Sequence, residues 1–94
     1  MNQIMNQKLF TIEDRFYITG QNGTVIVGEY QVNLPIFKVK DEIILIYPDG
    51  TETNTEVSGL EMFQTVSGKK KTAILIKDVT KEDVQIGTEV FLKT

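Results

Sequence analysis

The chain has 94 residues, of which 40% are hydrophobic and 24% charged, a balance typical of folded globular proteins rather than disordered chains. At this length a second domain would leave neither part with an adequate core, so we expect residues 1–94 to form a single domain. The sequence contains no Cys and no His, and its formal net charge is −3. These features exclude disulfides, the usual zinc sites and His-dependent hydrolase arrangements, and the charge argues against a general polyanion binder.

The N-terminal segment, Met1 to Lys8, lacks the basic start and long apolar stretch of a signal peptide. We therefore expect residues 1–8 to be an extension and the protein to be cytoplasmic. The longest apolar run, Ile43 to Tyr47, is far shorter than the roughly 20 residues that a membrane helix needs. We predict no membrane partner.

The first predicted element is a hairpin over residues 10–28. Its first strand has apolar residues at alternating positions, with a break at Asp14; these are Phe10, Ile12, Phe16 and Ile18. The segment 20–23 supplies Gly and Asn residues that tolerate positive φ. A β-branched run at 24–27 then provides the second strand and ends at Gly28.

The middle of the chain predicts another pair of strands. Leu34-Pro35 lies in a connection, because Pro cannot donate a ladder hydrogen bond. The continuous apolar run 43–47 is typical of a strand buried on both faces. Pro48-Asp49-Gly50-Thr51 is a turn, since Pro presets φ and Gly accepts the left-handed conformation, and it leads into a strand near 53–57.

Two further strands are predicted after a bend at Ser58-Gly59, one at 60–63 and one at 73–76. The only helical signal is at 80–84, where Thr80 precedes two early carboxylates, and we expect one turn there before Gly87. Short strands with Gly and Pro between them indicate an all-β barrel or sandwich.

Charged pairs and aromatic residues are the candidates for functional sites in this sequence. Adjacent residues of a strand point to opposite faces, so Glu13 and Asp14 do not share acid-base work. Lys69, Lys70 and Lys71 are either a solvated loop or a phosphate contact. We expect the five phenylalanines to be core rather than base-stacking residues; they are Phe10, Phe16, Phe37, Phe63 and Phe91. No catalytic residue or metal ligand is identified, so we expect neither an enzyme nor a cofactor.

Several segments, in order, resemble domain 2 of elongation factor Tu and related translational GTPases over Leu9 to Leu92. Residues 10–20 and 23–28 resemble the opening hairpin of the family's domain. The family's Lys-Val-Gly-Asp/Glu-Glu-Val and Val-Thr-Gly-Val-Glu-Met-Phe resemble residues 38–43 and 57–63. Its Gly-Val-Leu-Leu-Arg resembles residues 73–77, and its Lys-Arg-Glu-Asp-Ile-x-x-Gly resembles Lys81-Glu82-Asp83-Val84 with Gly87.

The resemblance implies a closed six-stranded antiparallel barrel of Greek-key-like topology, here without the GTPase domain that accompanies it in the family. It places Glu13, Asp14 and Phe16 by an aminoacyl pocket, with Ile18 and Glu61 flanking a terminal adenine. The family's loop Arg is absent from residues 20–24, and its Arg after the second strand is replaced by Glu29.

Two functions follow from these observations. The first is a non-catalytic module that binds RNA, either a tRNA acceptor end or ribosomal RNA, with help from Lys69 to Lys71. The alternative is a protein-interaction module that docks onto a separately encoded partner, such as a GTPase domain, or onto itself.

Overall fold

The computed structural model describes residues 7–30, 36–77, 79 and 84–93, and these residues form an all-β fold without an α-helix. The strands are β1 (Gln7–Thr11), β2 (Asp14–Ile18), β3 (Gly23–Glu29), β4 (Glu42–Ile46), β5 (Glu52–Glu56), β6 (Gly59–Gln64), β7 (Lys70–Lys77) and β8 (Glu89–Leu92). A single 3₁₀ turn, η1 (Thr19–Gln21), lies between β2 and β3. In these ranges no helix is long and apolar enough to cross a membrane.

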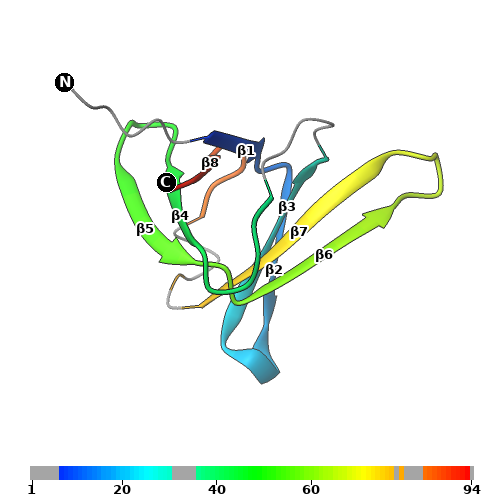
Figure 1. The fold of residues 1–94 in the computed structure, drawn as a ribbon, viewed down its shortest axis with the longest axis horizontal. Coiled ribbons are helices and arrows are strands. Elements are labelled where there is room, and N and C mark those ends of the chain that lie inside the picture. Colours follow the sequence, from blue (N-terminus) through cyan, green and yellow to red (C-terminus); the bar gives the residue numbers. More distant parts are fainter. Residues whose placement is uncertain (1–6, 31–35, 78, 80–83, 94) are drawn as a thin grey trace.

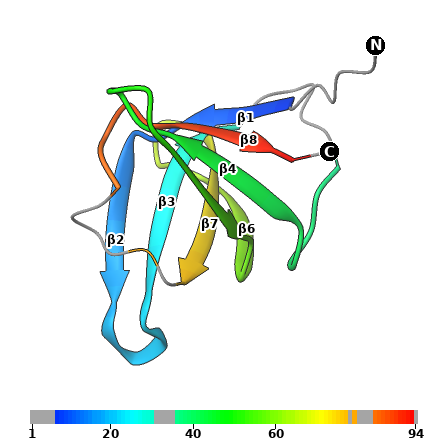
Figure 2. The same ribbon diagram turned by 90° about the vertical axis from the view of Figure 1, so that its left-hand side faces the viewer.

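The strands form two antiparallel four-stranded sheets, in the orders β1-β8-β4-β5 and β2-β3-β7-β6. The strands of one sheet run across those of the other (Figure 2), so the sheets pack nearly orthogonally. The chain passes between the sheets four times, and two of these passages are short corners. One corner lies at Ile12 and Glu13, between β1 and β2, and the other at Val57 and Ser58, between β5 and β6.

The predicted all-β class and antiparallel pairing are confirmed, whereas a closed barrel of six strands is not. The described residues contain eight strands, because one predicted strand bends sharply and counts as two elements, and because β8 (Glu89–Leu92) was not predicted. The strand predicted over 10–18 is divided at the first corner, and the bend predicted at Ser58-Gly59 is the second corner. The first strand also begins at Gln7, inside the expected extension, where it pairs with Leu92.

The first corner reverses which side chains face the core. Phe10 and Ile12 are fully buried, but Phe16 and Ile18, at the same alternating positions, are 52% and 36% exposed. The extra residues at the corner act like a bulge, which shifts the alternation so that one apolar set leaves the core. The prediction of one continuous inward-facing set was therefore wrong for the second half of the strand.

The core lies between the two sheets and is almost entirely aliphatic. Its largest fully buried side chains are Phe10, Leu9, Ile12, Ile26, Ile43, Leu45, Ile74 and Ile76. The predicted two-sided burial of the 43–47 run is confirmed for Ile43, Ile44 and Leu45. Val57 and Val84 complete the cluster at the second corner and before β8.

The predicted turns form by the expected backbone chemistry. Asn22 takes the left-handed conformation (φ 53°) that ends η1 and begins β3. Gly50, with φ 92°, donates its N–H to the Tyr47 carbonyl and closes the turn before β5. The segments predicted at Leu34-Pro35 and at residues 80–83 lie outside the described residues.

Two hairpins extend beyond the core, β2–β3 and β6–β7 (Figure 1). The five phenylalanines are not all internal, contrary to the prediction. Phe10 and Phe37 are buried and Phe91 is half-buried. In contrast, Phe16 on β2 is 52% exposed and Phe63 on β6 is 45% exposed. That prediction was wrong for Phe16 and Phe63 because both lie on the face of the β2–β3–β7–β6 sheet that points away from the core.

Candidate binding face

The β2–β3–β7–β6 sheet has one face against the core and one that points away from it, here called the outer face. Strand register determines its composition, since residues paired across antiparallel strands point to the same side. One row across the sheet is Phe16, Val25, Leu75 and Gly59, and the next is Asp14, Val27, Ala73 and Glu61. Four of the residues implied by the family resemblance thus share this face: Asp14, Phe16, Ile18 and Glu61.

A pocket of about 170 Å³ opens on the outer face between Ile18 and Glu61. Its lining comes from all four strands and the η1 turn and consists of Ile18, Gln21, Val25, Gly59, Leu60, Glu61, Ala73 and Leu75. The lining is mostly aliphatic, with one carboxylate and one amide among its side chains. Such a surface suits a flat apolar group that also carries hydrogen-bond donors.

Glycine keeps part of this surface free of side chains. A Cβ at Gly59 would lie 3.2 Å from the Leu75 Cβ, a tight contact inside the pocket. A Cβ at Gly23 would lie 2.7 Å from Leu75 Cδ1 and 2.9 Å from the Ile76 carbonyl oxygen. The Leu75 side chain therefore occupies the space between the two glycines.

Glu13 and Lys71 form an ion pair, although they lie 58 residues apart in the sequence. Glu13 is at the first corner, and Lys71 is on β7 opposite Glu29. The Lys71 side chain is only 16% exposed, against 42% for Glu13. The candidate phosphate-binding Lys71 is therefore already neutralised by another of the sequence-predicted site residues.

Asp14 has a different role from its neighbour Glu13. Its carboxylate accepts a hydrogen bond from the backbone N–H of Arg15, at 2.8 Å, at the start of β2. Because the two adjacent acids have separate partners, they do not form a carboxylate pair. The Arg15 Nε, buried on the other side of the strand, has no hydrogen-bond partner among the described residues.

The remaining lysines of the 69–71 run lie at the far end of the β6–β7 hairpin. Lys69 belongs to the turn, where its N–H donates to the Thr65 Oγ1 at 3.1 Å. Lys70 begins β7 opposite Gln64. Within the described ranges neither side chain takes part in an ion pair. The three lysines therefore do not form one basic cluster on the outer face.

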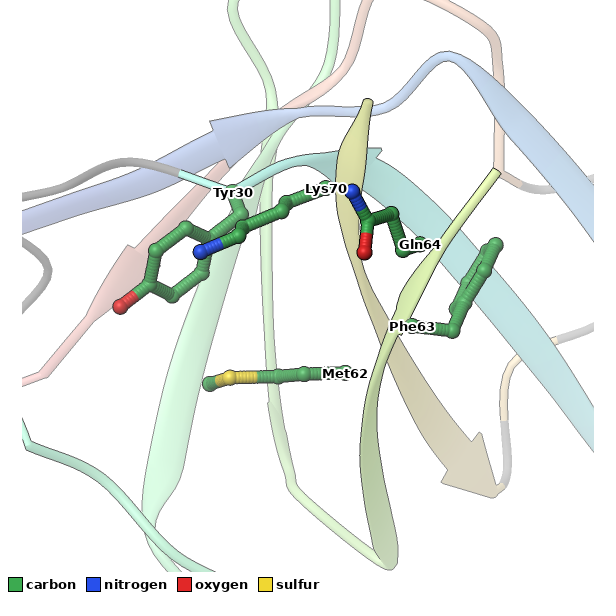
Figure 3. A pocket seen from close by; sticks show the side chains of 5 residues that line it. All are labelled: Tyr30, Met62, Phe63, Gln64 and Lys70. Atoms are coloured by element: carbon green, nitrogen blue, oxygen red, sulfur yellow. The ribbon is translucent and has the colours of Figure 1, made fainter. Parts of the chain in front are cut away.

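A second, wider pocket of about 340 Å³ lies beside this hairpin. It is lined by Tyr30, Met62, Phe63, Gln64 and Lys70, and Figure 3 shows Met62 and Lys70 extending toward Tyr30 while Phe63 points away from them. Sequence reasoning missed Tyr30 and Met62. The sequence shows an adjacent apolar Met-Phe pair in this strand. That pair alone does not indicate a pocket, because only the structure shows that the hairpin projects beyond the core.

Two aspartates have pKa values that are lowered by turn hydrogen bonds. The backbone N–H of Lys38 donates to the Asp41 carboxylate and holds its pKa below the ordinary value, and the backbone N–H of Thr51 does the same for Asp49. Both residues lie in the β1-β8-β4-β5 half, away from the outer face. No group of three or more acidic side chains placed to hold a metal ion occurs in the described ranges.

A scan against models of known protein families finds none that matches this chain.

Proposed function

We propose that this chain is a non-catalytic binding module of the elongation factor Tu domain 2 type. We further propose that it binds an RNA end on its outer face. The observation that carries the proposal is the pocket between Ile18 and Glu61, because the residues implied by the resemblance to flank a terminal adenine line one cavity. Phe16, half exposed on the same strand, extends the apolar surface beside it.

The physical properties of the pocket support a single base as its ligand. Its volume of about 170 Å³ is below the roughly 300–1,000 Å³ of pockets that hold drug-sized ligands, so the pocket suits a small group such as one base. Unpaired RNA bases are recognised by contacts to their flat faces and by hydrogen bonds to their edges. The aliphatic side chains around Leu75 would contact the face, and the Glu61 carboxylate would accept hydrogen bonds from an amino or hydroxyl group.

We also infer that the two sheets form one six-stranded barrel. Hydrogen bonding supports this, because it continues through the first corner: Ile12 N–H donates to the Thr88 carbonyl and Glu13 N–H to the Val27 carbonyl, each at 2.8 Å. At the second corner Ser58 N–H donates to the Leu75 carbonyl, also at 2.8 Å. If each bent segment is one strand, the order around the barrel is β1/β2, β8, β4, β5/β6, β7 and β3, which returns to β2.

The distribution of charge makes a specific prediction about RNA affinity. Lys71 is neutralised by Glu13, which leaves Lys69, Lys70 and Lys77 as the lysines of β7 and its turn that can contribute released counterions. For a single strand, about 0.7 per neutralised phosphate gives these three lysines a slope of log affinity against log salt of at most about −2.1. Raising the salt from about 50 to about 200 mM would then weaken binding by about 18-fold at most.

The test is a fluorescence anisotropy titration of labelled single-stranded RNA with a 3′-terminal adenosine, alongside labelled tRNA and ribosomal RNA fragments. Ile18→Ala should weaken binding by about tenfold, the effect expected when a partly buried aliphatic contact is lost. Ile86→Ala is the matched control, since Ile86 is an exposed isoleucine that does not line the pocket. Absence of binding at low salt, or equal effects of the two variants, would reject the proposal.

The alternative is a protein-interaction module that docks onto a separately encoded partner, such as a GTPase domain. The observation in its favour is that apolar side chains, such as Phe16 and Ile18, are exposed on a chain whose net charge is −3. Affinity capture with the wild-type chain and with Phe16→Asp, followed by sizing of the recovered complex, tests it. A partner that binds both forms equally would contradict a role for this face.

A further inference from the structure

The β6 strand is an open edge of the β2–β3–β7–β6 sheet, and hydrogen bonding at its turn shows which backbone groups are unpaired. Thr65 N–H donates to the Lys69 carbonyl, so this pair is hydrogen-bonded. Bonded and non-bonded pairs alternate along an antiparallel ladder. Phe63 and Glu61 are thus bonded to β7, while the N–H and C=O groups of the alternate residues point to the open edge. These residues are Leu60, Met62 and Gln64.

An independent hydrogen bond agrees with this assignment. Tyr30 N–H donates to the Lys70 carbonyl at 3.0 Å, so the backbone of Lys70 faces the β3 side. Its partner across the ladder, Gln64, must then face the opposite side, which is the open edge. In the described ranges, no backbone hydrogen bond outside the β6–β7 ladder involves the three open residues.

The other three edges carry features that discourage strand addition. Charged residues, Lys above all, protect exposed edges against pairing with another chain. Such residues are Lys8 on β1, Asp14 and Arg15 on β2, and Glu52 and Glu56 on β5. The β6 strand has only Glu61, and its exposed residues include Met62 and Phe63, which are 53% and 45% accessible. It is the least protected edge of the described fold.

We propose that β6 is a self-association edge and pairs antiparallel with β6 of a second copy of this chain. The occupant follows from symmetry, because a strand edge paired about a twofold axis is complementary to itself. The register is set by the open residues. With Met62 opposite Met62 of the second copy, Leu60 lies opposite Gln64, and every open group on both strands gains a partner.

This register also covers the exposed apolar side chains. The two Met62 side chains meet at the twofold axis on one face of the joined sheet, and on the other face Phe63 lies opposite Glu61 of the second copy. The projection of the β6–β7 hairpin leaves room for the second copy beside it (Figure 1). This inference does not depend on RNA binding, since the pairing is between protein edges.

The association should be weak and concentration-dependent. A single strand pair buries less than the roughly 1,200 Å² of the smaller stable protein interfaces. We therefore expect a dissociation constant on the order of 100 μM. Between about 10 μM and about 1 mM, the mass of the wild-type chain should rise from 10.7 kDa toward about twice that value.

Sedimentation equilibrium of the full chain tests this, with Met62→Lys as the perturbation. Two lysines facing each other at the twofold axis repel, and Met62 is exposed, so the variant should fold yet remain monomeric. Ile86→Lys is the matched control, because it makes the same charge change at an exposed apolar position away from β6. It should dimerise like the wild type.

Hydrogen exchange provides a second readout that separates the edge from the rest of the strand. The amides of Leu60, Met62 and Gln64 should exchange more slowly as concentration rises, whereas those of Glu61 and Phe63 should already be protected in dilute solution. A wild type that stays monomeric up to about 1 mM overturns the proposal. So does a Met62→Lys variant that dimerises equally well, or a rise in protection outside β6 only.

Discussion

Substituting Gly28 by alanine should test the first corner of the fold. Gly28 lies on β3 directly beneath the fully buried ring of Phe10, and a Cβ there would be 2.1 Å from Phe10 Cδ1 and 2.5 Å from Cγ. To restore an ordinary contact of 3.4 Å the ring must move by about 1.3 Å, the difference between 3.4 and 2.1 Å. The ring belongs to the buried core cluster, so such a movement would displace neighbouring core side chains.

The expected loss of stability for Gly28→Ala is about 2–3 kcal/mol, the upper part of the range for overpacked cores. For a domain of this size that lowers the Tm by about 8–24 °C. Urea and thermal unfolding followed by circular dichroism measure both quantities. Gly20→Ala is the matched control, since a Cβ at Gly20 has nothing within 4 Å, and it should change stability by less than about 0.5 kcal/mol.

A double mutant separates this clash from a general effect of glycine. Phe10→Ala removes Cγ and Cδ1, the two atoms nearest the added Cβ, so Gly28→Ala should cost at least about 1 kcal/mol less in that background. If Gly28→Ala is as stable as the wild type, or if the two substitutions are strictly additive, the packing of β1 over β3 described above is wrong.

Two further predictions concern charged groups. Glu13→Gln releases Lys71, so the slope of log RNA affinity against log salt should steepen by about 0.7. Glu56→Gln makes the same charge change on β5 and should leave the slope unchanged. Equal slopes for the two variants in anisotropy titrations would contradict the role given to the ion pair. Because the Lys38 N–H lowers the pKa of Asp41 in the folded state, Asp41 stabilises the fold above its unfolded pKa and this stabilisation is lost as the pH falls through the folded value. Below about pH 4 the Tm of the wild type should therefore fall more steeply than that of Asp41→Asn, and parallel curves in thermal scans would contradict the assignment.

The sequence was sufficient for features governed by neighbouring residues. The turn at Pro48-Asp49-Gly50-Thr51 and the left-handed Asn22 follow from local backbone preferences, and both were predicted. The burial of residues 43–45 was also recognisable, because a strand covered on both sides needs apolar residues at every position.

Features set by distant contacts could not be predicted in this way. The exposure of Phe16 depends on a corner at Ile12 and Glu13, and nothing local distinguishes that corner from a continuous strand. The neutralisation of Lys71 depends on Glu13, 58 residues away. The resemblance to elongation factor Tu placed Ile18 and Glu61 together, and these two do line one pocket, although their role in binding remains a proposal.

The central claim, that the outer face binds RNA, is tested most directly by nuclear magnetic resonance of the isotopically labelled chain. Titration with single-stranded RNA carrying a 3′-terminal adenosine should shift the amides of Ile18, Val25 and Glu61, around the small pocket. The amides of β4 and β5, in the other sheet, should stay in place. Unchanged spectra at low salt, or shifts confined to β4 and β5, would contradict the account.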